Sequence, residues 1–67
     1  MSKVVKVIEV MAQSSKSWED AAQNAVTEAS KSVRNIKSIY IKDKSAKVVD
    51  GKISKYRITA KISFVIE

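Results

Sequence analysis

The chain of 67 residues has no cysteine, no histidine and no proline, and it has a single glycine. The first two absences exclude a disulfide framework and Cys/His metal sites, and they remove the thiol nucleophile and the imidazole base. One glycine is too few for a glycine-rich phosphate loop. No nucleophile and base stand at a recognisable spacing elsewhere, so the sequence argues against an enzyme.

Long hydrophobic runs are absent as well. No stretch approaches the roughly 20 apolar residues of a membrane span. The first residues, Met1 to Val4, have neither a long apolar run nor a small-residue cleavage site. We therefore expect a cytoplasmic protein with no membrane partner.

The length predicts one domain over residues 1–67, near the size at which a monomeric core is marginal. No disulfide or Cys/His metal site can brace such a core. Oligomerisation is the favoured source of further buried surface, and an unusually well-packed monomer is the alternative.

Basic residues outnumber acidic ones, with 13 Lys and Arg against 7 Asp and Glu and a net charge of +6. This balance favours an anionic partner, whether a phosphate-bearing small molecule, nucleic acid or acidic lipid. The basic residues are scattered, so we expect most of them to be solvated surface. With two Tyr, one Trp, one Phe and no RNA- or DNA-binding signature, the sequence disfavours a nucleic-acid partner.

The first half of the chain predicts a strand followed by a helix. Lys3 to Met11 is rich in β-branched residues, and a short polar connection follows at 12–16. Ser17 is a good N-cap, and Asp20 completes a variant of the capping box. The helix should end near Arg34–Asn35, where Asn tolerates a left-handed cap. Its apolar stripe is dominated by alanine and comprises Ala22, Ala25, Val26, Ala29 and Val33.

The second half predicts a β-hairpin. Residues 36–49 are extended, and Asp50–Gly51 is a two-residue turn signal before a segment that alternates as far as Glu67. One face of that segment is apolar, and the other carries Lys55, Arg57, Thr59, Lys61 and Ser63. The element order is β-α-β-β, an α+β fold. With the longest strand in the middle, the sheet is three-stranded and antiparallel, in the order 1-3-2, with the helix on one face.

Several stretches carry a resemblance to a known family. They are Val4–Glu9, Ser17–Ala21, Ala29–Ile36, Asp50–Ile53, Lys55–Ile62 and Phe64. These stretches resemble the dodecins, small hollow-shell proteins known as flavin binders, without gaps over nearly the whole chain. The resemblance implies a sheet wrapped on one helix and a homo-dodecamer of tetrahedral symmetry. It also implies that the helix-free face of the sheet meets symmetry mates and lines the ligand sites.

Two positions depart from the flavin-binding pattern. In those members a Trp follows the Arg-Asn-Ile-basic run and a Gln follows the Tyr of the last strand, whereas this chain has Ser38 and Arg57. Ser38 cannot stack on a flavin ring, and Tyr40 on the same face lies roughly 6–7 Å further along the strand. The Arg57 guanidinium only donates hydrogen bonds, and it suits a carboxylate or a phosphate. An ion pair between Arg57 and an acid on a neighbouring subunit is the alternative.

The candidate ligand-binding residues share the helix-free face and are Ser38, Tyr40, Lys42, Arg57 and Lys61. An ordinary solvated sheet face is the alternative interpretation. The predicted function is that of a non-catalytic shell which stores or sequesters a small molecule. Its ligand would be a weakly bound flavin (FMN or riboflavin) or a phosphate-type anion. Some dodecins that lack the Trp bind calcium, so the resemblance also allows a metal ion at a subunit contact. The second hypothesis is a structural shell whose interfaces are the retained property.

Overall fold

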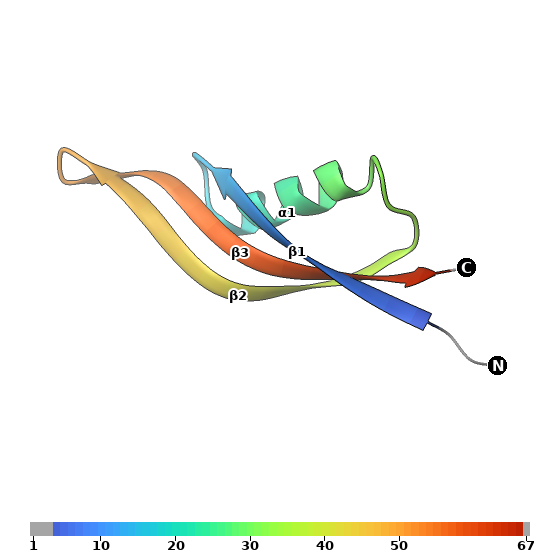
Figure 1. The fold of residues 1–67 in the computed structure, drawn as a ribbon. Coiled ribbons are helices and arrows are strands. Elements are labelled where there is room, and N and C mark those ends of the chain that lie inside the picture. Colours follow the sequence, from blue (N-terminus) through green and yellow to red (C-terminus); the bar gives the residue numbers. More distant parts are fainter. Residues whose placement is uncertain (1–3, 67) are drawn as a thin grey trace.

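The computed structural model describes residues 4–66 and contains four elements in the predicted order. They are β1 (Val4–Ser14), α1 (Trp18–Ala29), β2 (Ile36–Val49) and β3 (Lys52–Ile66). The longest strand, β3, is central, and it pairs antiparallel with both β1 and β2. The helix covers one face of this sheet (Figure 1). The predicted α+β topology with strand order 1-3-2 is therefore confirmed. Lys3 and Glu67, predicted at strand ends, lie outside the described residues.

The core is formed where α1 crosses the middle of β3. Ile58, Ala60 and Ile62 are buried on the apolar face of β3, and Ala21 and Ala25 are the buried residues of α1. Alanine keeps the helix axis close to the sheet because its side chain is small. The alternation of β3 thus fixes which face of the sheet the helix covers, as the sequence predicted.

The β1–α1 connection is held by hydrogen bonds around one buried hydroxyl. Ser17 caps the helix, with its Oγ accepting from the Asp20 amide at 2.9 Å. The Asp20 carboxylate accepts from the Ser14 hydroxyl at 2.6 Å, and the Ser14 Oγ accepts from the Lys16 amide at 2.9 Å. Because Ser14 is tied to the helix in this way, β1 continues to Ser14. The strand is therefore three residues longer than the predicted end at Met11.

The prediction that the helix ends near Arg34–Asn35 is wrong, because α1 ends at Ala29. The Ser30 hydroxyl donates a hydrogen bond to the Val26 carbonyl at 2.7 Å. Such local bonds from serine side chains to the backbone compete with helical geometry. The next amides make three-residue bonds of the tighter 3₁₀ type. Asn35 does adopt the left-handed conformation, with φ 61°, but it does so at the entrance to β2.

The β2–β3 hairpin extends further along the long axis of the molecule than β1 and α1 do. Asp50 and Gly51 both have positive φ, 52° and 75°, as a tight two-residue hairpin turn requires. The pairing of β1 stops where Ser14 faces Tyr56, so the end of the hairpin projects past β1 and α1 (Figure 1). The resulting shape measures 54 × 20 × 13 Å. Register shifts along β2 bend this arm.

Trp18 fastens the base of the arm to the helix. Its indole Nε1 donates to the Ser45 carbonyl at 2.9 Å, and its ring meets Tyr56 edge-on with centroids 4.9 Å apart. The Lys44 ammonium lies 5.8 Å from the indole centroid on the same side. These contacts give Trp18 a packing role between the helix and the hairpin.

Candidate functional site

The face of the sheet opposite α1 is the candidate site, and we call it the open face. The strand registers assign to it Val5, Val7, Glu9, Met11 and Gln13 of β1, Ser38, Tyr40, Asp43 and Ser45 of β2, and Arg57, Thr59, Lys61, Ser63 and Val65 of β3. Lys42 belongs to the same face through its contact with Glu9. All five predicted ligand-binding residues are on this face. Large apolar side chains are exposed beside them, and Met11 is 80% exposed.

Three of the predicted residues gather around a carboxylate. Lys61 lies between Glu9 of β1 and Tyr40 of β2 in the same row of the sheet. Lys42 occupies an irregularity of β2, and its Nζ reaches the Glu9 Oε2 at 3.3 Å. Both partners are half exposed, so this ion pair contributes at most about 1 kcal/mol to stability. Glu9 thereby lowers the net positive charge of the row.

Ser38 is already engaged by a neighbour. It lies opposite Ser63 of β3, and the two hydroxyls share a hydrogen bond. This pair is next to the Tyr40–Lys61 row, so this part of the open face presents two hydroxyls and one phenol ring beside the Lys61 side chain. Tyr40 is 66% exposed, which leaves most of its surface available to a ligand or a second copy.

Arg57 stands apart from the other candidates. It lies opposite Gln13 on β1 and Ser45 on β2. Along β3 it is six residues from Ser63, the partner of Ser38, which corresponds to about 20 Å. One chain therefore does not bring Arg57 and Ser38 together. Within residues 4–66 the ion pairs formed do not include Arg57.

Arg57 does border a shallow cavity of about 310 Å³ at the β1–β3 flank. Its lining residues are Met11, Ala12, Gln13, Arg57 and Ile58. A guanidinium beside thioether and aliphatic side chains suits a ligand that joins an anionic group to an apolar body.

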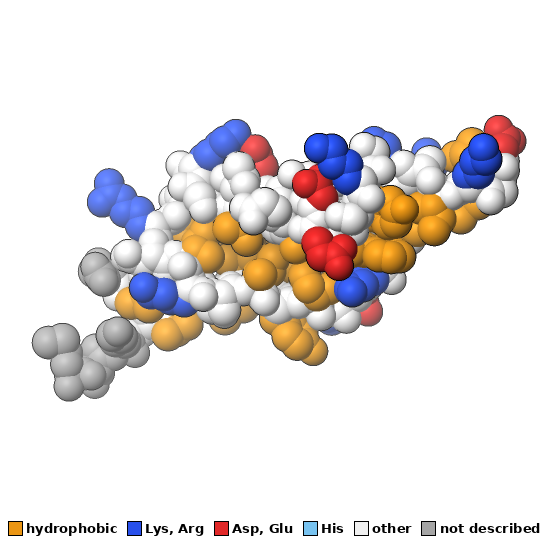
Figure 2. Space-filling model, turned by 180° about the vertical axis from the view of Figure 1, so that it is seen from behind, with side chains coloured by type: hydrophobic (Ala, Val, Ile, Leu, Met, Phe, Trp, Pro, Cys, Tyr) orange, Lys and Arg blue, Asp and Glu red, His pale blue; other side chains and the backbone are white. Residues whose placement is uncertain are grey.

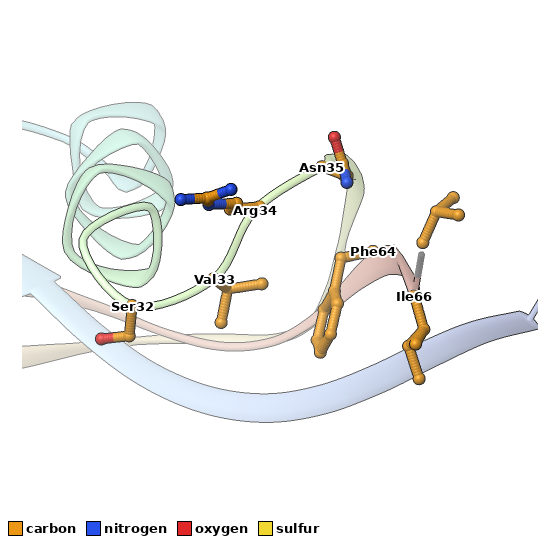
Figure 3. A pocket seen from close by; sticks show the side chains of 7 residues that line it. Ser32, Val33, Arg34, Asn35, Phe64 and Ile66 are labelled. Carbon is orange, nitrogen blue, oxygen red and sulfur yellow. The ribbon is translucent and has the colours of Figure 1, made fainter.

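Sequence reasoning missed two features of the surface. The sequence pattern gives no partner for Glu9, because its place among the lysines depends on the β1–β3 register. A second cavity of about 480 Å³ lies where α1 leads into β2. In Figure 3 the side chains of Val33, Phe64 and Ile66 point to the same side of it, whereas Arg34 turns back toward the helix. The sequence marked this segment only as a helix end.

In the described part of the chain, no group of three Asp or Glu side chains lies close enough together to hold a metal ion. Within residues 4–66, no helix is both long and apolar enough to cross a membrane.

Comparison with known proteins places this geometry in context. The family model for dodecin matches residues 4–67. The calcium dodecin of Mycobacterium tuberculosis, described as a calcium-chelating antigen with a novel calcium-binding site, is 38% identical. The match covers 96% of this chain and 91% of that one, with a TM-score of 0.82. No curated protein sequence matches the chain.

Two other solved structures have nearly the same fold. The dodecin from Streptomyces coelicolor is 26% identical, with a TM-score of 0.92 over 97% of this chain and 93% of that one. A mutant of the Thermus thermophilus dodecin is 24% identical, with a TM-score of 0.94 over 98% of both chains. The second likeness concerns the fold alone.

Proposed function

Because the chain belongs to the dodecin family, we propose that it is a non-catalytic subunit of a closed homo-oligomeric shell, a dodecamer, that stores or sequesters a small molecule. The whole sequence, residues 1–67, would act as one domain of that shell. The observation that carries the proposal is the open face. It exposes Val5, Val7, Met11 and Tyr40 on a sheet whose other face is already covered by α1. Burying such a face between copies would supply the apolar area that the small core lacks.

Flavin would bind weakly to this subunit. Tyr40 is the one aromatic residue of the open face within residues 4–66, since Trp18, Tyr56 and Phe64 lie on the helix side. The hydroxyl of Ser38, bonded to Ser63, offers no ring for stacking. The loss of one stacking platform costs about 1–3 kcal/mol per ring, by analogy with bases stacked on aromatic side chains.

A phosphate-type or carboxylate anion is the second candidate ligand. Arg57 supports it, because it faces the neutral side chains of Gln13 and Ser45 and borders an apolar cavity. The net charge of +6 supports the same class of ligand. The 38% identical calcium dodecin supports a cation instead. Within residues 4–66 no three carboxylates lie together, and Glu9 is held by Lys42, so a calcium site built from these residues would combine carboxylates from more than one copy.

The decisive experiment is native mass spectrometry of protein purified without added cofactor, combined with its absorption spectrum and its ion content. The proposal expects a particle far larger than 7.4 kDa at micromolar concentration, with little flavin absorbance. Bound calcium in that particle would favour a cation as the ligand. Bound phosphate or a bound organic anion would favour an anion site at Arg57. A stable monomer or dimer would refute the shell.

A further inference from the structure

The end of the β2–β3 hairpin, residues 47–55 (the hairpin tip), carries an exposed apolar pair beyond the reach of β1 and α1. Beyond the Ser14–Tyr56 pair it has no neighbour on β1. Val48 and Ile53 lie directly opposite each other there, 61% and 49% exposed. Figure 2 shows hydrophobic side chains continuing out to this end, where charged side chains surround the turn. An exposed apolar pair at the end of a projecting arm is typical of a surface that meets a partner.

A matching groove of about 460 Å³ lies between α1 and the outer edge of β1. It is lined mainly by apolar residues: Ile8, Val10, Met11, Ala12, Ala25, Ala29 and Val33, with Asn24, Glu28 and Ser32 as its polar members. The alanines of α1 leave room there for branched aliphatic side chains. Within residues 4–66, β1 pairs only with β3, so the groove opens beside an edge strand.

The charges of the two surfaces are opposite. The helix, Trp18–Ala29, carries three acidic residues and no Lys or Arg. One of these acids, Glu28, lies in the groove lining, where its exposed carboxylate also pairs with Lys31 at 2.8 Å. The hairpin tip carries Lys47, Lys52 and Lys55 against the single acid Asp50. Opposite potentials favour the approach of the tip to the helix and fix its orientation. The complementarity is internal to one sequence, which points to a second copy of this chain as the partner.

We propose that the hairpin tip of one copy docks into the α1–β1 groove of a neighbouring copy, with Val48 and Ile53 seated against Ala25 and Ala29. This inference rests on the proposed oligomeric shell and specifies one of its contacts. The arm projects away from the groove of its own chain (Figure 1), so the contact joins different copies. Tip and groove are different surfaces, so each copy donates one tip and receives another, and such a contact closes by forming rings.

Cysteine cross-linking tests the contact directly, because the natural chain has no cysteine. Val48→Cys and Ala29→Cys are placed in separate copies that carry different tags, and the copies are then mixed during refolding. Mild oxidation should link the two tags in a disulfide dimer. Gln23→Cys is the matched control, since Gln23 is exposed on α1 and does not line the groove. Its linkage to Val48→Cys should be at least about tenfold lower in yield.

Charge reversal provides an independent readout. Lys52→Glu and Glu28→Lys should each shift the assembled particle toward smaller species, and the double variant should recover most of the assembly. Val48→Asp with Ile53→Asp should abolish it, whereas Gln23→Asp should leave it unchanged. A merely structural role for these residues would not produce recovery in the double reversal.

The outcomes separate this inference from the shell proposal. If the unmodified protein is monomeric, the shell itself fails and the docking fails with it. If the unmodified protein is a large particle, the docking alone is overturned by either of two results. The first is a particle of full size in the Val48→Asp, Ile53→Asp variant. The second is cross-linking of Ala29→Cys no better than that of Gln23→Cys, as expected if another molecule occupies the groove.

Discussion

Replacing Ser38 by Trp should restore flavin binding, and the size of the gain follows from the stacking surface returned. One aromatic platform is worth about 1–3 kcal/mol per stacked ring, which corresponds to about 5- to 140-fold in affinity. The position can accept the larger side chain, since Ser38 is exposed on the open face and contacts only the Ser63 hydroxyl by hydrogen bond. Titration of riboflavin with protein measures the gain, because stacking on an indole quenches flavin emission.

The second substitution, Arg57→Gln, tests whether the two positions share one site. A Gln amide both donates and accepts, as the mixed edge of a flavin requires, whereas Arg only donates. Ser38 and Arg57 lie about 20 Å apart in one chain, as the strand rise implies. A further gain from Arg57→Gln in the Ser38→Trp background should therefore occur only in the assembled particle. Dilution to dissociated subunits should remove it.

Two control variants test whether the flavin site lies at Ser38. Thr59→Trp places an indole on the same face one row away from Lys61, and it should quench much less than Ser38→Trp. Tyr40→Ala should remove the residual binding of the unmodified protein. Strong quenching by the unmodified protein at low micromolar concentration would refute the claim that Ser38 weakens the site. Equal quenching by Thr59→Trp would refute the assignment of the site to Ser38.

Three further predictions concern ions, the core and the helix cap. Phosphate should raise the thermal midpoint more than chloride at equal ionic strength, and Arg57→Ala should lose that increment; a variant that keeps it would show that Arg57 holds no anion. Ile62→Ala should lower the free energy of unfolding by about 2–5 kcal/mol in a denaturant titration, because Ile62 is fully buried beneath α1; a loss below about 1 kcal/mol would contradict its place in the core. Ser17→Ala should cost about 0.5–2 kcal/mol, because the Asp20 amide loses its acceptor, whereas Ser17→Asp should retain most of the stability; equal loss in both variants would argue against a capping role.

The fold was predictable because the alternation of β3 shows which of its faces packs against the helix. Its strict alternation separates Ile58, Ala60 and Ile62 from Arg57 and Lys61, and the Asp50–Gly51 turn fixes where β2 must end. These are local signals that survive in any packing. The helix end was not predictable from the same rules. The apolar spacing continues to Val33, but the helix ends at Ala29, where the Ser30 hydroxyl donates to the Val26 carbonyl and the next amides bond to carbonyls three residues back.

The sequence predicts on which face of the sheet each candidate residue lies, but it does not predict the distances between these residues. Alternation places Ser38, Tyr40 and Arg57 on the open face, and the structure agrees. Which residues face one another depends on register, and β2 shifts register three times along its length. The Lys42–Glu9 pair in particular joins strands that are not adjacent in the sheet, so no pattern within either segment could reveal it.

The two edges of the sheet differ in how well they resist unwanted pairing. β2 carries Lys37, Lys42, Lys44 and Lys47 along its length, and lysine on an edge discourages further strand addition. β1 begins with Val4, Val5 and Val7, all more than half exposed, interrupted only by Lys6.

Until another copy covers it, the free edge of β1 is therefore a template for aggregation. Assembly of the proposed shell and aggregation would both need encounters between copies, so their rates would rise together with concentration. Refolding yield should then depend less on dilution than on the temperature and salt that favour the specific encounter.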